Sequence, residues 1–129
     1  DLGRLRPRSY SFGLTASYAA GRFGASMVSS TPMDVLAEFL PALQEHDKRA
    51  ALPVFQNVEL LVLVGETDRL TPREQSEEIV RRVPGAEYGV VPDAGHMVTL
   101  EKHEVVDAHL IDLLNRVHRD IAAHERTAG

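Results

Sequence analysis

The sequence contains no cysteine and no tryptophan, and only 5% of its 129 residues are aromatic. Without cysteine, disulfides and thiolate chemistry are excluded, and the composition fits a reducing compartment such as the cytoplasm. No apolar run approaches the roughly 20 residues that a membrane-spanning helix needs, so no transmembrane segment is predicted.

Positive charge is also scarce, since 14 Lys and Arg stand against 19 Asp and Glu and give a net charge of −5. The basic residues are scattered rather than grouped, and this distribution argues against a nucleic-acid partner. A hydrophobic content of 43% and a charged content of 26% are ordinary for a soluble globular protein. The chain is long enough for one small domain with a core, but its composition does not indicate an oligomeric state.

The first residues, DLGRLRPRSY, include no Met and no recognisable start of a fold. Positions 1–30 are rich in Ser, Gly, Arg and Tyr and show no sustained hydrophobic periodicity. We therefore expect a segment of a longer protein, in which any signal peptide would lie upstream.

A helix is predicted from Thr31 to about His46. Thr31 is expected to cap it, with Pro32 in the first helical position and an acid two residues later. Pro41 should kink this helix or divide it in two. Apolar residues recur along it at helical spacing: Val35, Leu36, Phe39, Leu40 and Leu43.

The second half of the sequence alternates strands and helices. The aliphatic run 60–64 is typical of a strand buried on both faces of a parallel sheet, and residues 87–91 predict a second, short strand. Between them, Thr71 and Glu74 form a capping box for a helix that should end before Pro84-Gly85. A crossover through a helix implies parallel strands and the α/β class.

A final amphipathic helix is predicted from about Lys102 to about His124. Its apolar stripe consists of Val106, Leu110, Leu113, Val117 and Ile121, widened by Leu114. Two strands alone make a poor sheet, which again points to partners outside this stretch of chain.

Asp68 and His96 follow the two predicted strands, in the tetrads GETD and DAGH. In open parallel sheets, ligands and catalytic groups gather at the carboxyl ends of the strands. Adjacent strands would place both loops at one edge, so we expect a hydrogen bond between the carboxylate and the imidazole. Such a bond fixes the tautomer of the ring and stabilises the imidazolium that forms when histidine accepts a proton.

Three stretches resemble the C-terminal part of the α/β-hydrolase superfamily: NVELLVLVGETDRLTP (57–72), RRVPGAEYGVVPDAGHMVTLE (81–101) and the closing helix. The resemblance implies that Asp68 is the acid and His96 the base of a catalytic triad, in the chain order Ser…Asp/Glu…His. It also implies that residues 1–49 are the end of a helical lid and residues 50–129 the C-terminal part of the core. The family often has Pro where Glu59 and His103 stand.

The nucleophile of this family stands in G-x-S-x-G between a buried strand and a helix. The nearest match surrounds Ser26, in Gly24-Ala25-Ser26-Met27-Val28, which lacks the second glycine. The preceding YAAGRF is no convincing strand, so we interpret Ser26 as a lid-loop residue. The nucleophile and the oxyanion hole are expected upstream.

Other polar residues have plainer interpretations. Asp93 is interpreted as a turn former and Glu101 as a carboxylate that starts a helix or braces a loop. The histidines outside the GH pair show no i, i+4 spacing, so no metal site is predicted; they are His46, His103, His109, His118 and His124. Phe39, Leu40 and Leu43 are interpreted as core residues, with the lining of an acyl or alkyl pocket as the alternative.

The function implied by the resemblance is hydrolysis of an ester or related carbonyl compound without a metal or organic cofactor. The substrate would be a small molecule, and the apolar lid helix suggests a hydrophobic one. Three alternatives stay open within the fold: an epoxide hydrolase or dehalogenase with an aspartate nucleophile, a perhydrolase or carbon–carbon bond hydrolase, and a non-catalytic binding protein.

Overall fold

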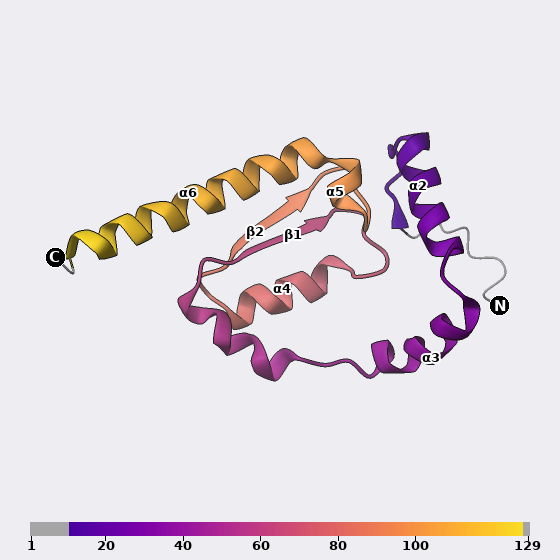
Figure 1. Cartoon of the computed structure of the whole chain (residues 1–129), viewed down its shortest axis with the longest axis horizontal. Coiled ribbons are helices and arrows are strands. Elements are labelled where there is room, and N and C mark those ends of the chain that lie inside the picture. Colours follow the sequence, from indigo (N-terminus) through magenta and orange to yellow (C-terminus); the bar gives the residue numbers. More distant parts are fainter. Residues whose placement is uncertain (1–10, 128–129) are drawn as a thin grey trace.

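The computed structural model describes residues 11–127, so the DLGRLRPRSY segment lies outside the described residues (Figure 1). In chain order the elements are α2 (Tyr18–Ser29), α3 (Met33–Gln44), the 3-10 helix η2 (Arg49–Asn57), β1 (Leu61–Gly65), α4 (Arg73–Arg82), β2 (Glu87–Val91), α5 (Val98–Glu101) and α6 (His103–Thr127).

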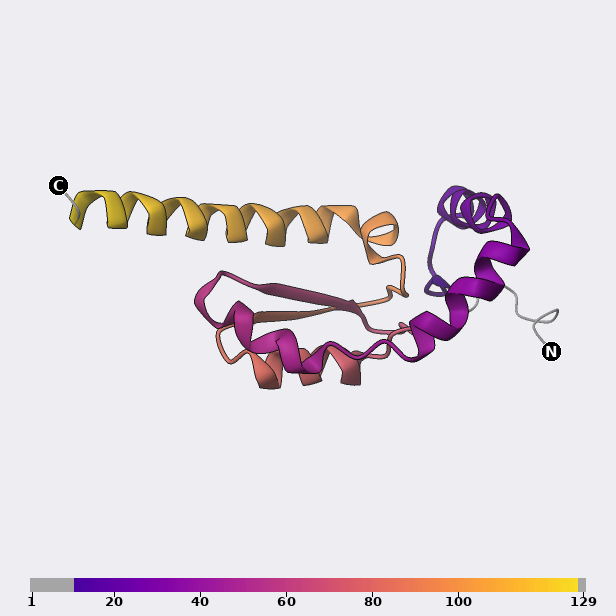
Figure 2. The same cartoon turned by 60° about the horizontal axis from the view of Figure 1, so that its bottom comes forward.

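The strands β1 and β2 pair in parallel, with Leu61 opposite Glu87 and Gly65 opposite Val91. The helices α4 and α6 cover opposite faces of this sheet, and α2 lies beyond the carboxyl ends of the strands (Figures 1 and 2). The predicted α/β class and parallel pairing are therefore confirmed. Buried apolar side chains gather around the sheet and its carboxyl edge; among them are Val64, Val83, Val91, Ala94 and Val106.

The apolar stripe of α6 is only partly buried. Val106, near the start of the helix, is in the core, whereas Leu110, Leu114 and Ile121 are exposed. Strands of five residues span about 17 Å, whereas a helix of 25 residues spans about 37 Å, so α6 extends well past the sheet (Figure 2). The helix is predicted correctly, but much of its stripe has no partner among the described residues.

Both predicted threonine caps are wrong. The helices α3 and α4 begin one residue after Pro32 and Pro72, which occupy the N-cap position without a side-chain hydrogen bond. The hydroxyl of Thr31 instead donates to the carbonyl of Met27, at 3.4 Å. That of Thr71 donates to Oδ2 of Asp68, at 2.9 Å. In each case the proline occupies the cap position, and the threonine hydroxyl donates to an acceptor outside the helix instead of accepting from its first turn.

Pro41 does not divide α3, which is one helix from Met33 to Gln44. A proline removes the bond to the carbonyl four residues earlier and crowds that carbonyl, but here it stands in the last turn, where few helical bonds follow. No residue of α3 is buried, and Phe39 and Leu43 are 64% and 58% exposed. The core interpretation of Phe39, Leu40 and Leu43 is therefore wrong for this chain.

The helix α2 is not predicted from the sequence. Ser17 caps it by accepting a hydrogen bond from the N–H of Ala20, and its two buried residues are Gly21 and Gly24. A side chain at Gly24 would collide with the ring of Phe12, so the missing Cβ lets helix and ring approach. Glycines carry no apolar signal, which is why hydrophobic periodicity fails here.

Candidate active site

The loop after β1 holds the carboxylate of Asp68 in one orientation. Its Oδ1 accepts the backbone N–H of Leu70, at 2.9 Å, and that of Thr71, at 3.0 Å. These bonds use the polypeptide of the same loop, so the aspartate is fixed before any partner approaches from β2. Only 5% of its side chain is exposed.

The loop after β2 presents His96. Asp93 has φ 54°, the left-handed conformation that Asp tolerates in turns, which fits its predicted role as a turn former. Its N–H donates to Glu66 at 3.2 Å. The loop then passes over the end of β1, where a Cβ on Gly65 would meet the carbonyls of Ala94 and Gly95. Glycine at position 65 therefore permits the close approach of the two loops.

Asp68 and His96 meet at this edge, as the topology predicts. Nδ1 of His96 lies 3.0 Å from Oδ2 of Asp68. The hydroxyl of Thr71 lies 2.9 Å from the same Oδ2 and 3.1 Å from the same Nδ1. The His96 side chain is 36% exposed, so the ring remains accessible while its carboxylate partner is covered. The sequence pattern predicts a helix cap at Thr71 and gives no sign of this contact.

Burial of Asp68 raises the pKa of its carboxyl, but hydrogen bonds outweigh that effect. The N–H of Thr71, the ring of His96, the hydroxyl of Thr71 and the N–H of Leu70 all stabilise the charged form, and the pKa lies below its ordinary value. Asp68 is therefore ionised at neutral pH and can accept from both side chains. An ionised carboxylate at this position favours a protonated Nδ1, which leaves Nε2 as the basic nitrogen of the ring.

Glu101, at the end of α5, braces the His96 loop as one of its two predicted roles requires. Its Oε1 accepts the N–H of Gly95 at 3.0 Å, and its Oε2 accepts that of Gly13 at 2.7 Å. The N–H of Met97 in turn donates to the carbonyl of Ser11 at 3.0 Å. Residues 11–16 thus pack on the His96 loop, and no local sequence signal reveals this long-range contact.

Ser26 lies in the middle of α2, where its carbonyl accepts hydrogen bonds from Ser29 and Ser30. A helix interior is not the strand-to-helix turn that exposes a nucleophile in G-x-S-x-G. The interpretation of Ser26 as a loop residue is wrong, because α2 was missed.

Within residues 11–127, no cluster of three or more His, Asp or Glu side chains could hold a metal ion. Two of the additional histidines pair with carboxylates instead: His109 with Glu87 at 2.9 Å and His103 with Asp107 at 3.9 Å. In the same range, no helix combines the length and the apolar character that crossing a membrane requires.

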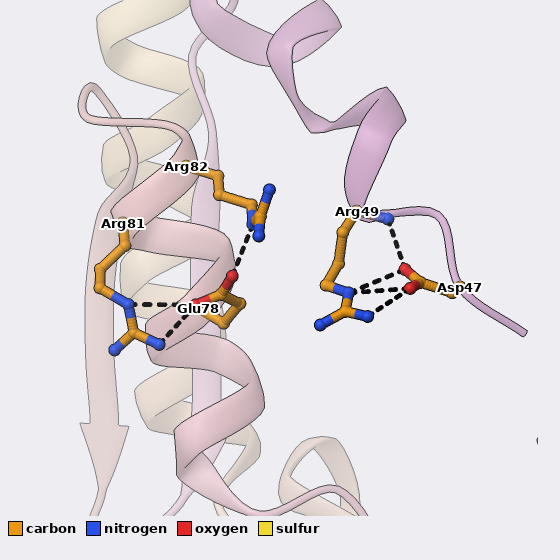
Figure 3. Close-up of polar contacts among 5 residues, drawn as sticks. All are labelled: Asp47, Arg49, Glu78, Arg81 and Arg82. Carbon is orange, nitrogen blue, oxygen red and sulfur yellow. Dashed lines mark hydrogen bonds and ion pairs between the residues drawn. The ribbon is translucent and has the colours of Figure 1, made fainter.

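A second surface feature is an open hollow of about 820 Å³ between residues 44–52 and α4. Several charges on and beside it are already paired: Asp47 accepts from Arg49, and Glu78 accepts from Arg81 and Arg82 (Figure 3). Neither Asp68 nor His96 lines the hollow, so the His96–Asp68 pair remains the candidate site.

Comparison with known proteins gives one family. The family model described as TAP-like protein, an α/β-hydrolase family, matches residues 36–122, more than half of the chain. No curated protein matches. Among solved structures, a thermophilic esterase from Thermogutta terrifontis, studied with malate bound, is 38% identical over 46% of this chain and 22% of its own, with a TM-score of 0.45. The chain thus spans less than a quarter of that esterase. The match over residues 36–122 includes β1, β2 and both site loops, and the chain belongs to the TAP-like α/β-hydrolase family.

Proposed function

We propose that this chain supplies the acid and the base of a hydrolase triad, Asp68 and His96, while the serine nucleophile and the oxyanion hole lie upstream. The observation that carries the proposal is the 3.0 Å contact between Oδ2 of Asp68 and Nδ1 of His96. Both oxygens of the buried carboxylate accept hydrogen bonds, and the carboxylate holds the ring of His96 at Nδ1. Its Nε2 is left for proton transfer.

The reaction would be hydrolysis of an ester or related carbonyl compound. Nε2 of His96 takes the proton of the upstream serine as the serine oxygen bonds to the carbonyl carbon, and then gives that proton to the leaving alcohol. Water repeats the cycle on the acyl-enzyme and releases the acid. Asp68 keeps its charge throughout and stabilises the imidazolium, so neither a metal nor an organic cofactor is needed.

We assign residues 1–49 to the end of a lid and residues 50–129 to the C-terminal part of the core. The exposed apolar side chains of α3 support a small, hydrophobic substrate, since a lid helix turns such residues towards its ligand. The absence of cysteine fits the reducing cytoplasm, which is the compartment we propose.

The test uses the full-length protein and a p-nitrophenyl ester. His96→Ala should abolish turnover, and Asp68→Asn should lower kcat by roughly 10²–10⁴-fold, because an amide cannot stabilise the imidazolium. Circular dichroism should show that both variants fold. His118→Ala, which removes an exposed imidazole from α6, is the matched control and should keep wild-type turnover. Near wild-type turnover by His96→Ala would refute the triad assignment.

A further inference from the structure

Three polar atoms at the site form a closed triangle. Oδ2 of Asp68, Nδ1 of His96 and Oγ1 of Thr71 lie 2.9–3.1 Å from one another along all three edges. Every edge has hydrogen-bond length. Only two hydrogens are available for these three edges, one on the hydroxyl and one on the ring. Their positions can be assigned by comparing the two tautomers of the ring.

If Nδ1 carried no hydrogen, the lone pairs of Nδ1 and of the charged Oδ2 would face each other at 3.0 Å. The single hydroxyl hydrogen of Thr71 could bond to Nδ1 or to Oδ2, but not remove the repulsion between the two. If Nδ1 is protonated, the hydroxyl donates to Oδ2 and the ring N–H points between Oδ2 and Oγ1 as a three-centre bond. The triangle therefore favours the Nδ1–H tautomer.

The hydroxyl of Thr71 is held in place by its own backbone. The N–H of Thr71 donates to Oδ1 of Asp68 at 3.0 Å while its hydroxyl donates to Oδ2. One residue thus contacts both oxygens of the carboxylate, and the carboxylate in turn directs the lone pairs of the hydroxyl towards the ring. The hydroxyl thus faces the site rather than the first turn of α4, which begins after Pro72 without a side-chain cap.

We propose that Thr71 is a positioning residue of this hydrolase site, because its hydroxyl orients Asp68 and supplies a second acceptor to the Nδ1 hydrogen of His96. The inference rests on the proposed function and extends it by one residue. When His96 takes a proton at Nε2, the positive charge spreads over the ring, and both acceptors at Nδ1 stabilise it. Thr71 acts through the ring and the carboxylate rather than on the substrate.

The experiment compares Thr71→Val, which keeps the shape but removes the hydroxyl, with Thr71→Ser, which keeps the hydroxyl, in the full-length protein. We expect Thr71→Val to lower kcat about ten-fold, as for loss of one charge-assisted hydrogen bond, with KM unchanged. The kcat of Thr71→Ser should stay within about three-fold of the wild-type value, because serine keeps the hydroxyl and its hydrogen bonds. Thr71→Ala provides a second hydroxyl deletion in case the valine variant does not fold.

A spectroscopic readout separates positioning from general stability. The Nδ1 proton of His96, observed by ¹H–¹⁵N NMR without substrate, should shift in Thr71→Val and keep its wild-type position in Thr71→Ser. Thr67→Val is the matched control, because the Thr67 hydroxyl joins the same two loops by donating to the carbonyl of Ala94 at 2.9 Å. It should lower the melting temperature without moving the ring proton.

Two outcomes would overturn the inference. One is a Thr71 hydroxyl deletion that leaves both kcat and the ring proton unchanged, and the other is an equal shift of the ring proton in Thr67→Val. Because the NMR signal needs no turnover, failure of Thr71 is distinguishable from failure of the proposed function. The proposed function fails if His96→Ala retains turnover, whatever the ring proton does.

Discussion

At the residue scale, Glu101 joins the loop that carries His96 to Gly13, which lies 88 positions from Glu101 in the chain. Each carboxylate oxygen accepts one backbone N–H, from Gly13 and from Gly95, and the latter directly precedes His96. Both oxygens of the side chain are therefore engaged in holding backbone N–H groups. The loop that presents the histidine therefore depends on a residue outside the triad.

We expect Glu101→Gln to loosen this loop, because the amide nitrogen cannot accept a hydrogen bond and leaves one N–H unpaired. An unpaired, partly buried N–H costs about 1–3 kcal/mol. The measurement is hydrogen exchange at the amides of Gly13 and Gly95 in the full-length protein, at least one of which should lose protection.

Glu125→Gln, on the exposed last turns of α6, serves as the control and should leave both amides protected. Unchanged exchange at Gly13 and Gly95 in Glu101→Gln would show that the brace contributes nothing to the loop.

The candidate pair could be predicted from the sequence, whereas the residues that support it could not. Asp68 and His96 follow recognisable strands, and parallel topology alone brings them to one edge. The hydroxyl of Thr71 could accept a backbone N–H as a helix cap or donate to Asp68, and only the folded loop decides between these two roles. Glu101 finds Gly13 through tertiary packing, for which the sequence offers no periodic signal.

At the element scale, predictability followed the strength of the apolar pattern. The first strand, predicted from a continuous aliphatic run, lies one residue further along the chain than expected, and the second, shorter strand has the predicted bounds. The helix α2 escaped notice because it packs through Gly21 and Gly24. Its larger apolar residues, including Phe23 and Met27, are exposed.

A chain of polar contacts ties α6 to the sheet at the edge opposite the site. Glu87, the first residue of β2, accepts from His109 and Arg116, and Arg116 also donates to Glu59 at 2.9 Å. The family often has Pro at position 59, where this chain has Glu. This Glu59 forms an ion pair with Arg116 of α6. The hydrogen bond from His109, together with Arg116, outweighs burial and lowers the pKa of Glu87.

This lowered pKa has a consequence for stability. A carboxyl whose pKa is lower in the folded than in the unfolded state stabilises the fold at pH values above its unfolded-state pKa, 4.5 for Glu87. That contribution disappears as the pH falls through the pKa of the folded state. We expect Glu87→Gln to melt roughly 2–4 °C below wild type at pH 7. The two melting temperatures should converge as the pH falls below 4.5 and through the lower pKa of the folded state.

Thermal denaturation of the full-length protein between pH 3 and pH 7 provides the measurement. Repeating it in 1 M salt should shrink the difference at pH 7, since the pairs are partly exposed and screened. A difference that persists unchanged in acid would exclude the ionised carboxylate as its source.

At the scale of the whole molecule, the described chain brings together an acid and a base but leaves much apolar surface uncovered. Among the described residues, α3 and α6 carry exposed apolar side chains, and the sheet has two strands. Exposed apolar surface that is contiguous marks places where other protein or a ligand packs. The His96–Asp68 pair lies in the loops that follow the carboxyl ends of these two strands.

We therefore expect these 129 residues alone to show no p-nitrophenyl ester turnover, because within residues 11–127 no serine stands in a strand-to-helix elbow. Ser26, the nearest match, lies inside α2.

The assay compares the isolated chain with its Ser26→Ala and Ser29→Ala variants. The second variant removes a hydroxyl from the same helix and serves as the control. Turnover lost with Ser26→Ala but kept with Ser29→Ala would place the nucleophile in α2. Because no oxyanion hole or elbow surrounds that helix position, the reaction would then require a rearranged α2, and the assignment of the nucleophile to an upstream segment would be wrong.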